Sequence, residues 1–235
     1  MLTYEEFIAK LKEIKKVGWI KTHRTGNTGI GKTFEDLVNI KENNIAGPDL
    51  HNFELKSARK NSKSMLTLFT KSPLPPKANA GLLKKYGYPS AKWKGRKELH
   101  TTAKATGYNT LKGKKGFKIS ARKNKLILVS AKNQELGYWD KSTLKNSFER
   151  KYPALVYVKA ESKGRGGNEE FWFNEAYLLQ EFNFERFIEL VKQGLIAVDI
   201  RIGQYSDGRP HDHGTGFRVM PGKLDLCFKQ REQIL

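Results

Sequence analysis

The hydrophobic pattern of this chain changes period near residue 53, and this change limits the folds it can adopt. Thr3 and Glu6 have the spacing of a helix capping box, and apolar residues follow at helical spacing up to Gly18. Residues 34–38 have a second helical pattern. From residue 53 apolar and charged residues alternate, since Phe53 and Leu55 are each followed by a charged side chain. This alternation is typical of a half-buried strand. Such a chain packs helices against a sheet.

Further strands are expected along most of the chain. Residues 65–70 follow a short basic turn and predict a hairpin with residues 53–56. We also expect a helix over residues 184–193 and strands over residues 117–121, 126–131, 155–160, 171–173, 197–202 and 217–219. Residues 71–116 are rich in Pro, Gly and Lys, which predicts long loops or short helices that cover an anionic partner. Without strict alternation or a repeat, the best class is an α/β or α+β sheet with decorations.

The charge balance indicates a polyanionic partner. There are 44 Lys and Arg against 24 Asp and Glu, a formal net charge of +20, on a chain in which 11% of the residues are aromatic. This combination favours nucleic acid over a membrane, since a membrane-binding basic tail is short and clustered. The alternative is a soluble protein with many lysines for solubility.

Cysteine usage and apolar runs point to a soluble protein. Cys227 is the single cysteine, so the chain forms no internal disulfide and no zinc ribbon, which favours a reducing cytoplasm. The N-terminal residues lack the apolar core of a signal peptide, and no apolar run is long enough to span a membrane. We therefore expect an intracellular protein without membrane contact.

Residues 26–33, GNTGIGKT, match the P-loop pattern of nucleotide-binding proteins. That motif requires a buried strand directly before it, whereas residues 21–25 are polar, and no apolar strand that ends in a magnesium-binding aspartate follows. The alternative is a loop that caps a helix beginning near Thr33. Its glycines would let backbone amides approach DNA phosphates.

The strongest chemical pattern is Pro48-Asp49 followed by Glu54-x-Lys56. Alternation along a strand puts Glu54 and Lys56 on one face, and Asp49 can reach the same edge from the turn before it. Two carboxylates suit Mg²⁺, and a nearby lysine can orient or deprotonate an attacking water, as phosphodiester cleavage requires. Glu35 supplies a third carboxylate from the preceding helix, although a carboxylate there also suits the helix dipole.

A second pattern lies near the C-terminus, where Asp199 and Arg201 share a strand face. Arginine can bond a guanine edge with two hydrogen bonds and aspartate can accept from cytosine, so a β-ribbon with both could read G·C pairs. His211 and His213 could add major-groove contacts. Two alternatives are a surface Asp–Arg cross-strand pair and a metal site formed by the two histidines with Asp212.

Together these motifs resemble the MvaI/BcnI restriction endonucleases, relatives in fold of the mismatch-repair nicking enzyme MutH. The resemblance rests on residues 26–37, 48–56, 66–73, 198–203 and 211–215. It implies a PD-(D/E)xK nuclease core in a single two-lobed chain, with a catalytic lobe over about residues 1–85 and a DNA-recognition lobe over about residues 86–235. The catalytic positions would be Glu35, Asp49, Glu54 and Lys56, with Asp49 and Glu54 as metal ligands. The DNA contacts would be Asp199, Arg201, His211, Asp212, His213, Arg218 and His100.

The resemblance also implies an activity. The expected enzyme is a type II restriction endonuclease that uses Mg²⁺, with Mn²⁺ as a substitute, to cut duplex DNA at a short CC-x-GG-like site. It would act as a monomer that nicks each strand in turn, in a prokaryotic cytoplasm, with a DNA methyltransferase as genetic partner. The alternatives are a MutH-like strand-specific nicking enzyme for repair and a DNA-binding protein without catalysis.

Overall fold

The computed structural model describes residues 3–39, 53–152 and 154–235. The chain forms two compact units, one of residues 1–63, 149–183 and 225–235, the other of residues 64–148 and 184–224. The lobe boundary predicted near residue 85 falls inside the second unit. The division differs because the chain leaves the first unit after residue 63 and returns to it twice.

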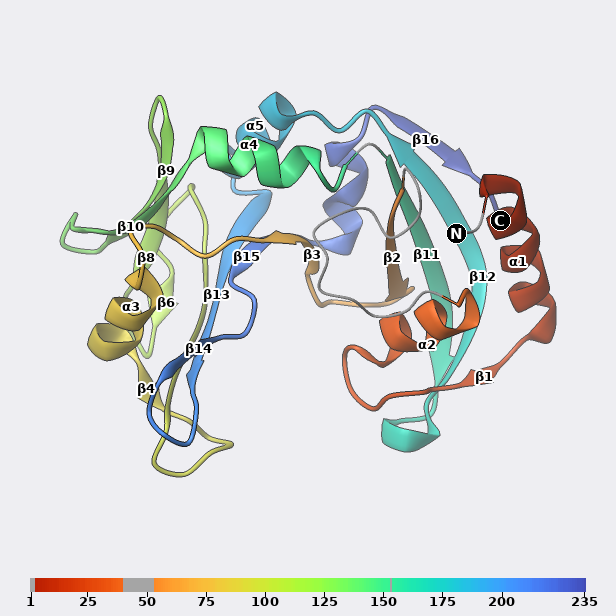
Figure 1. Cartoon of the computed structure of the whole chain (residues 1–235), viewed down its shortest axis with the longest axis horizontal. Coiled ribbons are helices and arrows are strands. Elements are labelled where there is room, and N and C mark those ends of the chain that lie inside the picture. Colours follow the sequence, from red (N-terminus) through yellow and green to blue (C-terminus); the bar gives the residue numbers. More distant parts are fainter. Residues whose placement is uncertain (1–2, 40–52, 153) are drawn as a thin grey trace. The chain divides into compact units, whose positions relative to one another are not determined.

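Among its described residues, the first unit contains the helices α1 and α2 and a five-stranded sheet in the order β1-β12-β11-β2, with β16 also paired to β12 (Figure 1). Its elements are α1 (Tyr4–Val17), β1 (Ile20–Lys21), α2 (Gly29–Leu37), β2 (Glu54–Arg59), β11 (Ala154–Lys163), a 3-10 turn η1 (Gly166–Asn168), β12 (Glu170–Gln180) and β16 (Gln230–Gln233).

Local sequence explains how both helices of the first unit begin. The predicted capping box is confirmed, because the Thr3 hydroxyl accepts from the Glu6 amide at 3.2 Å while the Glu6 carboxylate accepts from the Thr3 amide at 2.8 Å. The second helix begins at Gly29, earlier than predicted near Thr33. A Cβ at Gly29 would lie 2.2 Å from the carbonyl oxygen of Arg24, so only glycine fits this close approach.

A hydrophobic core of the first unit lies between its helices and one face of the sheet. Helix α1 contributes Phe7, Leu11 and Ile14, α2 contributes Ile30 and Phe34, and Val38 follows at the C-cap of α2. On the sheet side the core includes Leu55 of β2. Since side chains alternate along a strand, the residues on either side of Leu55 lie on the opposite face of β2.

The predicted hairpin between residues 53–56 and 65–70 is wrong. Strand β2 is the edge strand of the first sheet and pairs in parallel with β11, with Glu54 opposite Leu155 and Lys56 opposite Tyr157. Strand β3 instead belongs to the second unit, where it pairs with β15. The basic turn between them is a connection between units, which a short-range pattern cannot distinguish from a hairpin turn.

The second unit contains a six-stranded sheet in the order β3-β15-β13-β5-β4, with β14 also paired to β13, together with a three-stranded sheet β10-β9-β8 and a short β6-β7 ribbon. Its elements are β3 (Leu66–Thr70), α3 (Ala78–Tyr86), β4 (Tyr88–Pro89), β5 (Lys97–Ala103), β6 (Thr110–Leu111), β7 (Lys114–Lys115), β8 (Phe117–Ala121), β9 (Lys125–Ser130), β10 (Glu135–Asp140), α4 (Lys141–Glu149), α5 (Phe184–Lys192), β13 (Ile196–Gln204), β14 (Pro210–Asp212), β15 (Gly216–Val219) and the 3-10 turn η2 (Pro221–Cys227). Two of these, α4 and η2, extend across a boundary between the units.

Aromatic side chains form the core of the second unit. Phe69 of β3 packs against Phe217 of β15, Phe187 of α5 and Phe148 of α4, with ring centroids 5.1 to 6.2 Å apart. Trp139 adds an edge contact to Phe217, and its indole nitrogen donates to the Lys71 carbonyl at 2.8 Å. These aromatic contacts pack β3 and β15 of the large sheet against the helices α4 and α5.

The mixed α and β class is confirmed, and the strands predicted from residue 117 onward are present. Residues 71–116 contain more structure than predicted, above all β5, which pairs along β13 in the large sheet. Its sequence, KELHTTA, is mostly polar, and only Leu99 and Ala103 are fully buried. Among the described residues no helix is long and apolar enough to cross a membrane.

Candidate active site and nucleic-acid interface

The structure places Glu54 and Lys56 together, as the strand period predicts. Both lie on the face of β2 opposite Leu55, and the Lys56 ammonium donates to Oε1 of Glu54. The Glu54 side chain is 0% exposed, whereas Lys56 retains 27% exposure. A buried carboxylate beside a partly exposed lysine is a costly arrangement that a fold retains when the charges are paired.

Lys151 is a second lysine at the same carboxylate, and no sequence motif predicted it. It follows α4, and its Nζ lies 3.2 Å from both Oε1 and Oε2 of Glu54. Nothing in the local pattern distinguishes it, because it is one cation in a basic stretch 97 residues from Glu54. Two ammonium groups therefore meet one buried carboxylate.

Of the two other predicted catalytic carboxylates, only Glu35 lies within the described residues. Asp49 lies outside the described residues. Glu35 is half-buried on α2, whose Ile30 and Phe34 face the core on the Leu55 side of the sheet. The helix that bears Glu35 therefore packs on the opposite face of β2 from Glu54, at the sheet edge.

Glu54 has the chemistry for a hard cation. Carboxylate oxygens are the ligands that Mg²⁺ prefers, and this buried pair of oxygens already faces two positive groups. In the described ranges, no group of three or more His, Cys, Asp or Glu side chains is placed to hold a metal ion. His211, Asp212 and His213, which lie within those ranges, accordingly do not form the alternative metal site.

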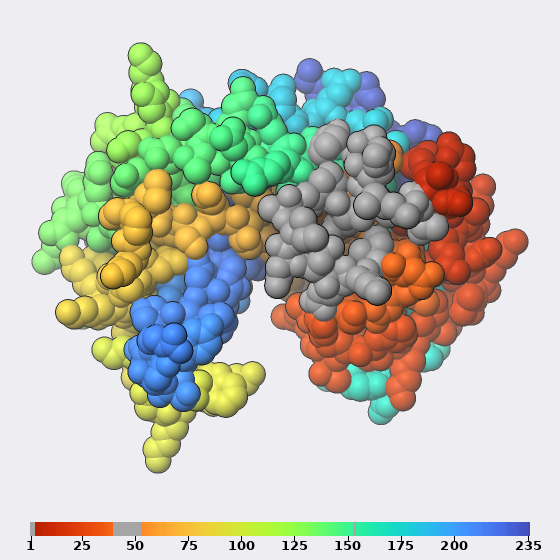
Figure 2. Space-filling model, viewed as in Figure 1, coloured from red at the N-terminus to blue at the C-terminus, as the bar shows by residue number. Residues whose placement is uncertain are grey.

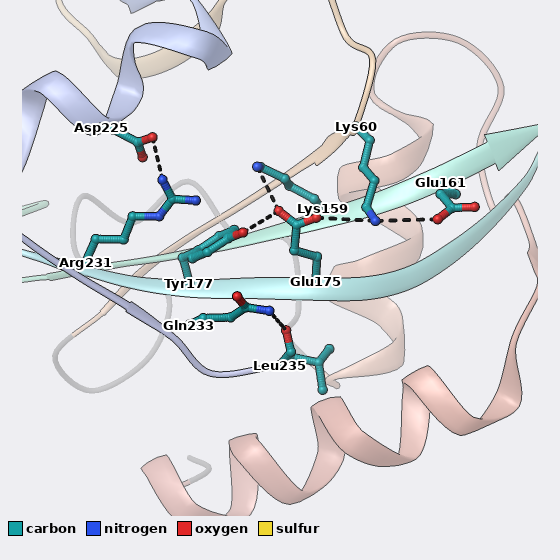
Figure 3. Close-up of polar contacts among 9 residues, drawn as sticks. All are labelled: Lys60, Lys159, Glu161, Glu175, Tyr177, Asp225, Arg231, Gln233 and Leu235. Carbon is teal, nitrogen blue, oxygen red and sulfur yellow. Dashed lines mark hydrogen bonds and ion pairs between the residues drawn. The ribbon is translucent and has the colours of Figure 1, made fainter.

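The polar face of the sheet continues from Lys56 toward a second carboxylate, Glu175. Figure 3 shows Lys159 and Tyr177 bonded to Glu175, at 2.8 and 2.6 Å, with Lys60 between Glu175 and Glu161. Burial alone would raise the pKa of Glu175, but the hydrogen bonds from Lys159, Tyr177 and Lys60 outweigh it and lower the pKa to about 2. Glu175 is thus a fixed negative charge.

Tyr157 lies in the same region, next to Lys56 in the strand register. Burial, with smaller contributions from Asp225 and Glu175, raises the pKa of Tyr157 to about 12. Figure 3 also shows Asp225 paired with Arg231, at 2.7 Å. Tyr157 therefore remains protonated at neutral pH.

The second unit contains a cavity of about 490 Å³ lined by five of the seven predicted DNA-binding residues. These are His100, Arg201, His211, His213 and Arg218. They come from β5, β13, β14 and β15 and the loop after β14, which adjoin through β13. Figure 2 shows the blue segment around residues 203–213 beside the yellow segment around residues 90–97, and both line this cavity.

Asp199 lies beneath the cavity and is 1% exposed. It accepts from the Thr102 hydroxyl at 2.7 Å and from Nε of Arg201 at 2.6 Å. Nε of Arg218 lies 3.0 Å from the same carboxylate, as an ion pair without hydrogen-bond alignment. Asp199 therefore holds Arg201 and Arg218 at the cavity wall. Its carboxylate oxygens are directed at these side chains and at the Thr102 hydroxyl.

The cavity histidines form a chain of ring contacts. The ring centroids of His211 and His213 are 4.3 Å apart, and those of His100 and His213 are 6.2 Å apart. Burial lowers the pKa of both His100 and His213, helped by the neighbouring Arg201 for His100 and by the other two histidines for His213. Both rings therefore favour the neutral form, which has one donor and one acceptor nitrogen.

Asp212 faces away from this set. It accepts from Ser72 and Asn79 side chains at 2.6 Å and from the amides of Gly214 and Thr215 at 3.0 and 2.6 Å. It lines a different cavity, around residues 70–77. The Asp212 side chain therefore closes the turn after β14 and connects that turn to α3.

One part of the cavity wall was not predicted, the loop of residues 90–96 between β4 and β5. Trp93 is 51% exposed, and Lys92 and Arg96 lie 5.2 and 5.0 Å from its ring centroid. The sequence AKWKGRK, an aromatic residue among basic ones, is the pattern that could have indicated it.

The P-loop-like segment has another structural explanation. The preceding strand, β1, has only two residues, and Lys32 lies within α2, where its ammonium pairs with Asp36 at 2.6 Å. Arg59 contacts the carbonyl oxygens of Gly26 and Asn27 at 3.2 and 3.4 Å. This is a helix entry attached to the edge strand, and a phosphate-binding loop after a buried strand is not formed.

Comparison with known proteins identifies the class to which this fold and site belong. Residues 8–228 match the MvaI/BcnI restriction endonuclease family. The chain belongs to that family, and it is therefore a DNA nuclease of the restriction endonuclease kind. None of the curated protein sequences matches the chain.

Two solved structures are similar over their whole length. One is the restriction endonuclease MvaI in complex with its cognate DNA substrate, with 32% identity, full coverage of both chains and a TM-score of 0.87. The other is MvaI in the absence of DNA, with 33% identity, full coverage of both chains and a TM-score of 0.56.

Proposed function

We propose that the protein is a type II restriction endonuclease that hydrolyses duplex DNA at a short CC-x-GG-like site with Mg²⁺. The observation that carries the proposal is the buried Glu54 carboxylate with Lys56 on the same strand face, in a member of this family. The net charge of +20 supports a polyanionic substrate, and the solved DNA complex is the relative with the higher of the two TM-scores.

In the proposed active site, Glu54 and Asp49 hold Mg²⁺, which Mn²⁺ can replace, and Glu35 supplies a third carboxylate. The metal ion supplies charge stabilisation at the scissile phosphate. Lys56, partly exposed and anchored on Glu54, orients the attacking water and offsets negative charge that develops at the phosphate. Burial of Glu54 fixes this geometry, because a fully buried side chain has little freedom to rotate.

In the proposed recognition site, Arg201 and Arg218 read guanines. Asp199 engages the Nε of each guanidinium, so the terminal nitrogens are the groups that would bond guanine O6 and N7. Neutral His100 and His213 would offer one donor and one acceptor each to neighbouring base edges. Two such arginines fit a site that contains G·C pairs.

We further propose that the enzyme acts as a monomer. One chain contributes one Glu54 and Lys56 pair, so a nearly palindromic site would be nicked on one strand and then on the other. Host DNA would be protected by a cognate methyltransferase, and the enzyme would work in a prokaryotic cytoplasm, where such systems meet foreign DNA.

The test is digestion of methylation-free plasmid by the purified protein, with and without Mg²⁺, followed by sequencing of the fragment ends. Discrete Mg²⁺-dependent fragments that share one motif are expected. A nicked intermediate should accumulate at enzyme amounts equal to the number of sites. Nicks alone, or tight DNA binding without cutting in any condition, would instead support a strand-specific repair nickase or a noncatalytic binding protein.

A further inference from the structure

We propose that Lys151 is a positioning residue that holds Glu54 in the metal-free enzyme and competes with the divalent cation for the same oxygens. The inference rests on the proposed metal-dependent nuclease function. It adds a second lysine, from a segment remote in sequence, to the Glu-x-Lys pair.

The contact geometry separates the two lysines. The Lys56 ammonium contacts Oε1 of Glu54, whereas the Lys151 ammonium lies 3.2 Å from Oε1 and 3.2 Å from Oε2. Lys151 therefore spans the edge of the carboxylate on which both oxygens are available. A hard cation that binds this carboxylate uses the same oxygens.

The charges explain why Glu54 cannot hold Lys151 and a divalent cation equally well at the same time. Glu54 is fully buried, and an unpaired buried carboxylate is strongly disfavoured, so a positive partner is needed whether or not a metal ion is bound. Among the described side chains at this contact, two lysines face one carboxylate and leave a positive excess. A divalent cation at Glu54 would be repelled by Lys151, whose charge lies 3.2 Å from the shared oxygens.

The Lys151 ammonium can leave the Glu54 carboxylate for another partner. Its side chain is 27% exposed, and lysine is a flexible cation that binds phosphate well. A DNA phosphate brought to the site would offer Lys151 another partner and free the oxygens of Glu54. Metal binding would then be favoured by DNA binding, and the free protein would bind the metal weakly.

The experiment measures Mn²⁺ binding to the full chain without DNA, by titration calorimetry and by electron paramagnetic resonance of the free ion. The variants are Lys151→Met and Lys151→Gln, which remove the charge, and Lys151→Arg, which keeps it. Lys63→Met, a change of an exposed lysine in the same unit, is the control for the loss of one positive charge. Circular dichroism verifies that each variant is folded.

We expect Lys151→Met and Lys151→Gln to bind Mn²⁺ at least about tenfold more tightly than the wild type, because a unit charge near a divalent ion has that effect even with water-like screening. Lys151→Arg and Lys63→Met should match the wild type. Damage to the fold would not tighten metal binding. Unchanged, weaker or undetectable binding in a folded neutral variant, or an equal gain in Lys63→Met, overturns the proposal. Failure of the wild type to cut DNA would instead refute the proposed function.

Discussion

The Asp199 carboxylate offers a sharp test of the proposed recognition site. It is 1% exposed and engages Nε of Arg201 at 2.6 Å and of Arg218 at 3.0 Å, both through Oδ2. Replacement of Asp199 by asparagine keeps the shape and one acceptor but removes the negative charge. Both arginines then lose the group that fixes them at the cavity wall, while their own positive charges remain.

The expected cost follows from these contacts. A hydrogen bond to a charged group contributes about 1.5–3 kcal/mol, and the loss of one partner of a buried charge pair costs about 2–5 kcal/mol. The side-chain amide of the Asp199→Asn variant would still accept one hydrogen bond. We therefore expect a loss of specific binding free energy in the lower half of the range of about 2–5 kcal/mol. A loss of about 3 kcal/mol weakens specific binding roughly a hundredfold.

The assay is fluorescence anisotropy with a cognate and a noncognate duplex at one fixed salt concentration. Nonspecific binding depends on total positive charge, so it should stay unchanged or increase slightly in Asp199→Asn. Asp207→Asn is the matched control. Asp207 pairs with Nε of Arg209 at 2.7 Å, but both side chains are largely exposed, and the change should leave both affinities unaltered.

The result that would refute this reasoning is a folded Asp199→Asn protein that binds the cognate duplex within about threefold of the wild type. Equal loss on both duplexes would also refute it, because the arginines would then contribute charge and no base discrimination.

Further predictions concern catalysis and stability. Lys56→Ala should lower the cleavage rate at least about a hundredfold with DNA affinity retained, as measured by single-turnover digestion and anisotropy. At pH values above 4.5, the ordinary pKa of its carboxyl, Glu175 should stabilise the fold by about 3 kcal/mol. This contribution should fade as the pH falls toward the folded-state pKa of about 2. Urea unfolding of Glu175→Gln across that range should therefore converge with the wild type at acid pH. Trp139→Phe removes the donor to the Lys71 carbonyl and should cost about 1–2 kcal/mol in urea unfolding. Phe34→Ala should cost about 3–5 kcal/mol in the same measurement, since its ring is 1% exposed between α2 and the sheet.

Short-range sequence patterns were sufficient to predict features that depend on a single helix or strand. The capping box at Thr3 involves residues three apart, and Glu54 and Lys56 share a face because side chains alternate along any strand. The segment of residues 53–56 was a reliable strand for the same reason. Its partner was predicted wrongly, because a strand pattern contains no information about which strand it pairs with.

The recognition residues show the same limit. Arg201, Arg218 and the histidines were selected from short motifs, and the structure gathers them around one cavity. Asp199 and Asp212 are alike in the sequence, since each is an acidic residue within two positions of a basic or aromatic one. The first lies under two arginines and the second closes a turn, a difference that depends on β13 pairing with β15 and on α3 packing nearby.

The sequence by itself determined the mixed fold class, the polyanionic partner and the Glu-x-Lys pair, because each depends on composition or on residues within one turn or strand. Only the tertiary structure decided that β2 pairs in parallel with β11 and that Lys151 reaches Glu54 from 97 residues away. It also decided that each unit is assembled from separated segments. Such contacts form when distant segments bury a shared core, and that requirement constrains the whole chain rather than any short stretch of it.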